Sequence, residues 1–306
     1  MLPAILTTIC FSFSVVCASR SAKLVGGMEA NFWRLALAAV FLAIWAFSWG
    51  QGLASPAFPT FFLSGIIGIG FGDIGLFQAL TRIGPRLTIL LVQCLTAPFA
   101  AAIEWWWLGA RLSPAEIFWA VVILAGIGVS LAPGEHLHIP RRQFVPGVVF
   151  GILGALGGAF GAVLSRKAYQ TLGQEGASLD GGTAAFQRLI GGVIIAGIGL
   201  LLVKWRSVFD HVTRSSGAAT LPEGEKWRRA WPWILANSLA GQTIGVSFYQ
   251  WAFQTTRTGI VLPIVAMTPL MAMPMTRWLD HERVSRRAIL GGIIAVTGAI
   301  GLALHK

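Results

Sequence analysis

Two motifs, each present twice along the chain, decide the fold. SRSAK at residues 19–23 closes the first long apolar run, and the similar SRKA at 165–168 closes the sixth. FWRL at 32–35 opens the second apolar run, and FQRL at 186–189 opens the seventh, 154 residues later. Self-similarity at a fixed spacing indicates an internal repeat.

The later apolar runs repeat at a spacing of 172 residues. The matching pairs are Phe77-Gln78 with Tyr249-Gln250, Leu112-Ser113 with Val284-Ser285, and Gly126 with Gly298. We therefore predict two copies of one unit, the first at 1–133 and the second at 146–306, joined by a linker at 134–145.

The composition favours a protein that crosses a membrane several times. Of 306 residues, 55% are hydrophobic and 11% charged, and the mean hydropathy is +0.71. A soluble domain is nearer a quarter charged, so an ordinary cytosolic enzyme, a disordered chain and a disulfide-rich module are excluded. The net charge of +11 comes from bases in short gaps between apolar runs. This pattern favours contact with anionic lipid rather than nucleic acid.

About 20 apolar residues form a helix that spans the bilayer core. Ten such spans are predicted at 2–19, 31–49, 60–80, 87–108, 115–132, 146–165, 184–203, 231–252, 259–279 and 287–304. The predicted fold is thus all-α and integral to the membrane, with ten transmembrane helices.

Each repeat holds five spans, and five is an odd number, so the two copies must cross the membrane in opposite directions. Inverted-topology repeats in secondary transporters place the substrate near the midplane, between the halves. Loops after odd-numbered spans carry most of the Lys and Arg side chains. By the positive-inside rule, this charge distribution predicts that both termini lie outside.

The chain resembles the EamA-type branch of the drug/metabolite transporter superfamily over nearly its whole length. The resemblance rests on Arg34 and Arg188, near the start of the second span of each copy, and on a signature between the fourth and fifth spans. That signature reads Pro98 followed by LGARL at 108–112, and Pro269 followed by LDHERV at 279–284. Ala110 stands where the family usually has Glu, so only Glu282 keeps that acid.

The resemblance implies a secondary carrier of small metabolites, often an exporter, in the bacterial cytoplasmic membrane. Family members usually have both termini in the cytoplasm, opposite to the orientation that the charge distribution predicts.

Asp73 lies within the third span, where an acid is costly unless it is paired, protonated or hydrated. We weigh two roles for it: a coupling or substrate-binding site, with protons as a candidate coupling ion, or a structural ion pair with Arg34. Arg188 has no repeat-related carboxylate partner. It could bind an anionic substrate group or extend to the headgroups.

The eighth span carries the most polar face of the ten. Ser238, Gln242 and Tyr249 form one stripe at helical spacing, and Gln250 lies on the adjoining one. Such a face lines a wet cavity or forms hydrogen bonds between helices. The predicted substrate-binding residues are Arg34, Asp73, Gln78, Arg188, Ser238, Gln242, Tyr249 and Gln250.

Two further features have structural interpretations. Glu104 precedes three Trp residues at 105–107, which indicates a position near the headgroups. Glycines at 151, 154, 157, 158 and 161 predict tight helix packing along the sixth span.

The sequence shows no catalytic motif and no metal or cofactor site, so we do not expect an enzyme. We predict a secondary-active transporter that moves a small organic metabolite, such as an amino acid, by alternating access, as a monomer or homodimer. The alternatives are a membrane-embedded enzyme acting on a lipid-linked substrate, and a channel.

Overall fold

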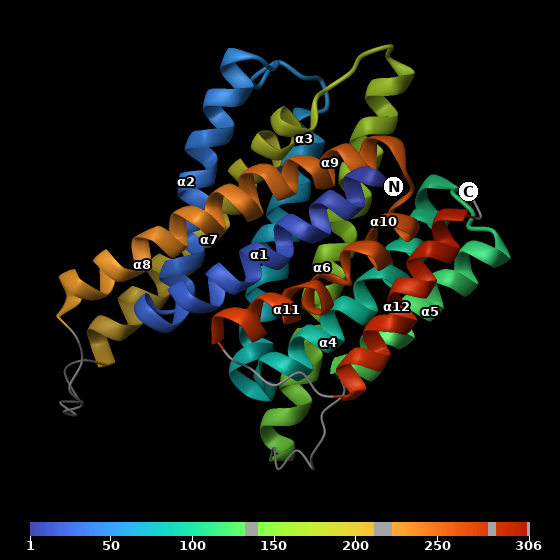
Figure 1. Cartoon of the computed structure of the whole chain (residues 1–306). Helices are drawn as coiled ribbons and strands as arrows, with labels where there is room; N and C mark the ends of the chain where they lie inside the picture. The colour runs from blue at the N-terminus through green and yellow to red at the C-terminus, as the bar shows by residue number, and fades with distance from the viewer. Residues whose placement is uncertain (132–139, 211–221, 281–285, 305–306) are drawn as a thin grey trace.

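The computed structural model of the protein describes residues 1–131, 140–210, 222–280 and 286–304, and all regular structure within these ranges is helical. The elements, shown in Figure 1, are α1 (Leu2–Val25), α2 (Gly27–Ser48), α3 (Phe58–Gly65), η1 (Ile66–Phe71), α4 (Gly72–Leu108), α5 (Pro114–Leu131), α6 (Arg141–Gln174), α7 (Gly181–Asp210), α8 (Glu223–Asn237), η2 (Ser238–Gly245), α9 (Val246–Thr255), α10 (Thr258–Val265), α11 (Thr268–Asp280) and α12 (Arg286–Leu304). The two η segments are π-helical and join the α-helices on either side of them.

Nine helical stretches of the described chain are long and apolar enough to cross a membrane. They match nine of the ten predicted spans. The remaining span corresponds to α8, η2 and α9, which run without a break from Glu223 to Thr255 but include the polar face noted above. α6 begins at Arg141, inside the predicted linker.

Local sequence explains where several helices break. The predicted third and fourth spans meet in α4 at Gly84, whose φ of 77° lies in the left-handed region that glycine adopts without strain. α5 begins with a capping box, in which the Ser113 N–H donates to Glu116 Oε2 at 2.6 Å and the Glu116 N–H donates to Ser113 Oγ at 3.2 Å. Pro114 takes the first helical position, where a backbone N–H would have no acceptor within the helix, so its absence costs no hydrogen bond.

The N-terminal part of the chain, residues 1–131, interlocks with the C-terminal part, residues 140–304. α1 packs against α8, η2, α9, α10 and α11, while α6 packs against α3, η1 and α4. α2 packs on α7, and α5 packs on α12. Each part therefore sends its first helix into the other part.

Glycines allow α6 to approach η1 and α4 at backbone distance. A Cβ on Gly161 would lie 2.7 Å from Gly68 Cα, and a Cβ on Gly157 would lie 2.9 Å from Gly72 Cα. Side chains at these positions would force the helices apart, so the glycine stripe of the sixth span packs tightly against the third.

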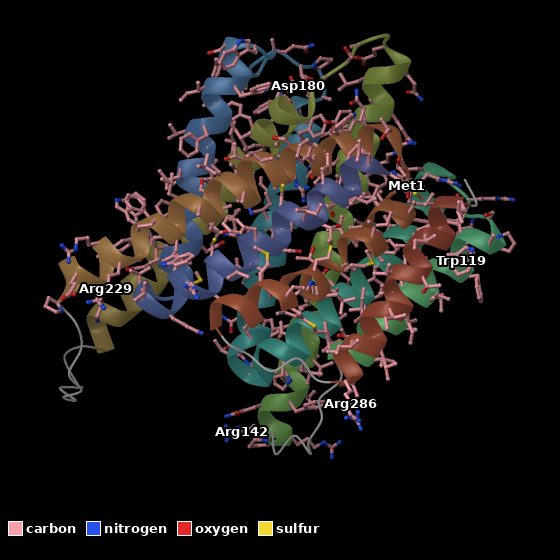
Figure 2. All side chains as sticks on the ribbon, viewed as in Figure 1. Met1, Trp119, Arg142, Asp180, Arg229 and Arg286 are labelled. Carbon is pink, nitrogen blue, oxygen red and sulfur yellow. The ribbon has the colours of Figure 1, made fainter. Side chains whose placement is uncertain are left out.

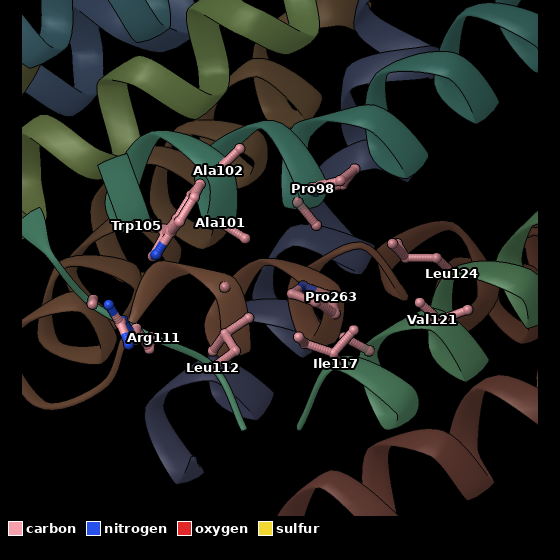
Figure 3. A pocket seen from close by; sticks show the side chains of 14 residues that line it. Pro98, Ala101, Ala102, Trp105, Arg111, Leu112, Ile117, Val121, Leu124 and Pro263 are labelled. Carbon is pink, nitrogen blue, oxygen red and sulfur yellow. The ribbon is translucent and has the colours of Figure 1, made fainter. Parts of the chain in front are cut away.

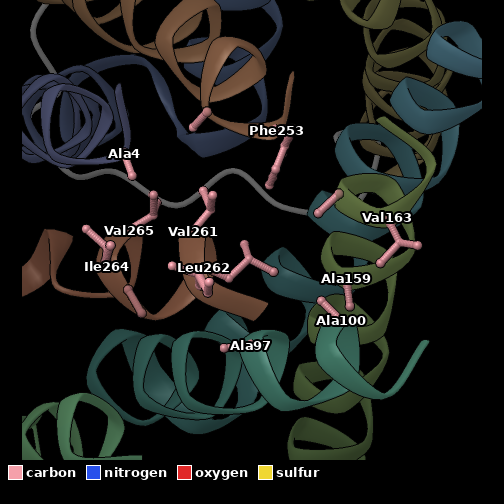
Figure 4. Close-up of a cluster of buried hydrophobic side chains, with 14 of the residues drawn as sticks. Ala4, Ala97, Ala100, Ala159, Val163, Phe253, Val261, Leu262, Ile264 and Val265 are labelled. Carbon is pink, nitrogen blue, oxygen red and sulfur yellow. The ribbon is translucent and has the colours of Figure 1, made fainter. Parts of the chain in front are cut away.

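The main hydrophobic cluster surrounds α10, which is buried along its whole length. Figure 4 shows Val261, Leu262 and Val265 of α10 between Ala4 of α1 and Ala97 of α4. Helices from both parts of the chain therefore share one core.

We expect Gly161→Leu to destabilise the protein by about 3 kcal/mol, because the new side chain meets backbone that cannot move aside. Thermal unfolding of the purified protein measures the change. Gly128→Leu is the matched control, because a Cβ on Gly128 meets nothing within 4 Å. Equal melting temperatures for the two variants would contradict the assigned packing.

Candidate functional site

The two ends of the helix bundle differ in charge. One end, which we call the basic end, holds Lys23 at the end of α1, Arg142 in α6, Arg229 in α8 and Arg286 at the start of α12. The opposite end, which we call the terminal end, holds Met1 and the loop that contains Asp180. Figure 2 labels residues at both ends.

A cavity of about 580 Å³ lies at the basic end, between α1, α2, α4 and α8. Ser19, Ala22 and Lys23 of α1 line its outer part. Arg34 of α2 and Asn237 of α8 also line it, so it reaches polar side chains within the bundle.

Arg34 lines this cavity, and Asp73 lies next to Arg34. Arg34 Nη2 is 3.8 Å from Asp73 Oδ2, and their side chains are 19% and 27% exposed. Asn31, one helical turn before Arg34, accepts a hydrogen bond from Arg34 Nε at 2.8 Å and also hydrogen-bonds Asp73. Asp73 Oδ2 has no hydrogen-bond partner. The pair predicted from the sequence is therefore present, and the Asp73 oxygen that faces Arg34 accepts no hydrogen bond.

Arg188 lies deeper, on α7, and is 5% exposed. Its guanidinium lies over the Tyr249 ring, with Cζ 6.0 Å from the ring centroid. A Cβ on Gly68 of η1 would lie 2.7 Å from Arg188 Nη2, so the missing side chain of Gly68 makes room for the guanidinium. Arg188 interacts electrostatically with Asp73, and burial excludes its extension to the headgroups.

The polar face of η2 and α9 packs against α1, α2 and α7 rather than facing outward as a whole. Ser238 and Gln250 are 0% exposed, yet the Ser238 hydroxyl and both amide atoms of Gln250 have no partner. Gln242 Oε1 and Thr243 Oγ1 are also buried without a partner. Unsatisfied buried polar atoms are rare in proteins, and they indicate ordered water or a ligand.

Gln78 does not join this group. It is exposed on α4, where its side-chain and backbone oxygens accept hydrogen bonds from Arg82. The structure thus brings Arg34, Asp73, Arg188 and Tyr249 together, with Ser238, Gln242 and Gln250 on the adjoining helix, and leaves Gln78 outside.

The terminal end holds a second group of charges, which the sequence did not predict as a cluster. Glu104 of α4 is 2% exposed and lies 3.9 Å from Arg166 Nε of α6. The Thr258 hydroxyl and the Gly259 N–H donate to Glu104 Oε2. The sequence placed Glu104 near the headgroups but did not predict these contacts from α6 and α10, which bury its carboxylate.

A second ion pair, between Arg257 and Glu116, also lies at the terminal end. Arg257 donates as well to the carbonyl of Arg111, and Arg166 Nη1 donates to the carbonyls of Phe253 and Gln254 at 2.6 and 2.9 Å. These bonds join the N-terminal part of the chain to the C-terminal part.

Asp180 caps α7 and connects it to α2. The Trp45 indole N–H donates to Asp180 Oδ1 at 2.8 Å, and the Thr183 N–H donates to the same oxygen at 2.9 Å. Burial opposes ionisation of this carboxyl, but hydrogen bonds from Thr183, Trp45 and Gly182 outweigh it and hold the pKa of Asp180 below its ordinary value. Nearby, Gln51 donates to the Ser178 carbonyl at 2.7 Å.

We expect Asp180→Ala to destabilise the protein by about 1–2 kcal/mol at pH 7, the usual effect of losing a helix cap. The lowered pKa means that this contribution is complete above the unfolded-state value, about 3.9, and is lost as pH falls through the folded-state value. The difference in melting temperature between wild type and variant should therefore be smaller at pH 3 than at pH 7. Glu175→Ala, at an exposed neighbour, is the control. A difference that persists unchanged at pH 3 would contradict the role of the ionised carboxylate.

Two other cavities are mostly apolar. One of about 650 Å³ lies between α4, α5 and α10, where Trp105, Leu124 and Pro263 line it and Arg111 lies at one side (Figure 3). The other, of about 360 Å³, lies between α2, η2 and α9. Of these three cavities, the one beside the ion pair is not the largest, but the residue chemistry favours the cavity at Arg34.

Comparison with known proteins places the chain in a family. The model of the EamA-like transporter family matches residues 1–132 and again residues 145–304. The chain belongs to the EamA-like transporter family. It is therefore an integral, multi-pass membrane transporter of the drug/metabolite transporter superfamily, and its partners are the lipid bilayer and a small-molecule substrate.

Solved structures share the fold of the chain. Matches to this EamA-like chain include 29 chains of solved structures. One, titled only as the crystal structure of a protein, covers 100% of this chain and 98% of its own length, with a TM-score of 0.75 and 16% identity. At that identity the likeness shows the fold alone. No curated protein matches the chain.

Sequence reasoning missed Asn31 and the burial of Glu104. Asn31 was detectable, because it precedes Arg34 by three residues and so shares its helix face.

The family acid Glu282 lies outside the described residues. No group of three His, Cys, Asp or Glu that could hold a metal ion occurs in the part of the chain that the structure describes.

Proposed function

We propose that the protein is a secondary-active carrier that moves a small organic metabolite across the bacterial cytoplasmic membrane by alternating access. The observation that carries this proposal is the contrast between the two ends of the bundle. A cavity enters from the basic end as far as Arg34, while ion pairs and hydrogen bonds between the two parts of the chain close the terminal end. A carrier caught open to one side has this arrangement.

The proposed architecture is ten transmembrane helices in two inverted repeats, at 1–133 and 146–306. Three observations support it. The family model matches twice, once in each repeat. The π-helical segments η1 and η2 begin at Ile66 and Ser238, which are 172 residues apart. The first helix of each part also packs against the third and fourth helical regions of the other.

This architecture counts α8, η2 and α9 as the eighth span. Its polar residues lower its hydropathy. Lipid would not tolerate those side chains, so they pack within the bundle. We propose that Ser238, Gln242, Tyr249 and Gln250 of this span form the substrate site with Arg34, Asp73 and Arg188.

Asp73 is the proposed coupling residue, with protons as the coupling ion. Its side chain is 27% exposed next to Arg34, which lines the cavity, and its Oδ2 has no hydrogen-bond partner. A proton that binds there would weaken the ion pair with Arg34 and so change the contacts between α2 and α4. Proton gradients can drive transport through such a step.

The positive-inside rule would place the basic end, and therefore the open cavity, in the cytoplasm. An exporter that loads its substrate from the cytoplasm needs its cavity open on that side.

Counterflow in proteoliposomes tests the proposed function. Vesicles containing the purified protein are loaded with one unlabelled solute from a panel of amino acids, organic acids and amines, and uptake of the same labelled solute is followed. A carrier gives saturable uptake that the internal solute accelerates. Electrical conductance without such acceleration would favour a channel, and release of a modified product would favour an enzyme; either result would overturn the proposal.

A further inference from the structure

Arg188 is a cation within the membrane-spanning bundle that lacks an acceptor. A guanidinium carries five N–H donors. Among the described residues, Arg188 has no side-chain hydrogen bond and no carboxylate within ion-pair distance, and its buried Nε is unpartnered. Its contact with the Tyr249 ring provides a π face but no acceptor oxygen. An unpaired charge in this position costs several kcal/mol.

The charges around Arg188 do not balance. Asp73 is the acid that interacts electrostatically with Arg188, and it already lies 3.8 Å from Arg34 and hydrogen-bonds Asn31. Two cations thus share one carboxylate, and the group formed by Arg34, Asp73 and Arg188 carries a net charge of +1. A bound group with a single negative charge would neutralise it.

The surroundings of Arg188 favour an anion that also has an apolar body. Tyr249 packs edge-on against Phe11, with ring centroids 5.8 Å apart, and against Phe253 at 4.2 Å. The guanidinium packs against Gly68, in the space that a side chain there would fill. A planar guanidinium binds a carboxylate through two parallel N–H donors, so the carboxylate can sit on Arg188 while the apolar body lies beside the aromatic rings.

We propose that Arg188 binds the carboxylate of the transported solute, and hence that the substrate is an organic monoanion. This inference rests on the proposed function and names the substrate class of that same site. A phosphate monoester carries about −1.5 to −2 at pH 7, so it would overcompensate the charge of the group, whereas a carboxylate matches it. Solutes whose only charge is positive are excluded by repulsion from the net positive group.

Ligand-induced thermal stabilisation of the purified full chain tests the proposal. Benzoate is the probe, benzamide is its neutral isostere, and phenyl phosphate is the dianionic comparison. For the wild type, we expect benzoate to raise the melting temperature in a saturable way, benzamide to have no effect, and phenyl phosphate to bind at least tenfold more weakly than benzoate.

Arg188→Gln should lose at least tenfold in benzoate affinity. It should also melt at or above the wild-type temperature without ligand, because it removes a buried charge that has no partner. Arg229→Gln, which removes a cation from an exposed pair with Glu225, should respond to benzoate like the wild type. Gly68→Ala provides a second variant that keeps the charge, and its Cβ should displace the guanidinium and weaken benzoate binding.

The outcomes separate this inference from the proposed function. Equal responses to benzoate and benzamide, stronger binding of phenyl phosphate, or an unchanged benzoate response in Arg188→Gln would each overturn the anion site. If one of these results occurs and a neutral or cationic solute shows counterflow, the protein is a carrier but Arg188 is not an anion site. Stabilisation by benzoate that depends on Arg188, in a protein without counterflow, would support the anion site and contradict the carrier.

Discussion

Arg166→Gln should destabilise the protein by about 3–5 kcal/mol, because it leaves the Glu104 carboxylate buried without its cation. Loss of Arg166 also removes its hydrogen bonds to the carbonyls of Phe253 and Gln254, in the last turn of α9. The terminal end of the bundle should loosen, since these contacts join α4, α6 and α9 there. Thermal unfolding of the purified protein measures the loss.

The double variant Glu104→Gln/Arg166→Gln should recover most of this stability, since it leaves no unpaired charge at that position. Arg229→Gln is the matched control: its pair with Glu225 is exposed, at one helical turn, and contributes at most about 0.5 kcal/mol. If Arg166→Gln and Arg229→Gln lower the melting temperature equally, or if the double variant is no better than Arg166→Gln, the Glu104 pair does not hold the terminal end together.

Asp73→Asn should slow solute exchange by about 100-fold and remove its dependence on pH. The variant leaves Arg34 and Arg188 without an acid between them. A 100-fold slower exchange corresponds to about 2.7 kcal/mol, which we expect from the loss of a partly accessible ion pair between Asp73 and Arg34. Asparagine keeps the shape of the side chain but does not titrate, so the proposed coupling step is lost. Counterflow measured between pH 5 and pH 8, with a solute identified in the panel, records both effects.

Arg34→Gln/Asp73→Asn separates coupling from charge balance. The double variant has the wild-type net charge of +1 at this group but no titratable acid, so exchange should partly recover while its pH dependence stays absent. Asp73→Asn with wild-type rates and a wild-type pH profile would remove Asp73 from the coupling mechanism. The same holds if the double variant regains the pH profile.

The sequence predicted the spans well where apolar runs are long and bounded by charges. It placed the Arg34–Asp73 pair because Arg34 enters from the same side as Asp73 and has a side chain long enough to reach it. It also predicted a span at 231–252, where α8, η2 and α9 run without a break from Glu223 to Thr255. These features depend on local pattern, which a single sequence contains.

Other features depend on contacts between distant segments and could not be predicted. The three Trp residues after Glu104 give no sign that Arg166 and Thr258 bury that acid. The π-helical turns η1 and η2 have no composition that distinguishes them from α-helix. The depth of Arg188 follows from Gly68, which lies 120 residues away in the sequence and leaves space for the guanidinium.

Distances between spin labels test alternating access most directly. In a variant with Cys10, Cys17 and Cys94 replaced by Ala, one pair of labels at residues 54 and 175 reports on the terminal end, and a second pair at 23 and 228 reports on the basic end. When an exchanging solute is added, the account predicts that one distance lengthens as the other shortens. Both distances changing in the same direction, or neither changing with a solute that exchanges, would contradict it.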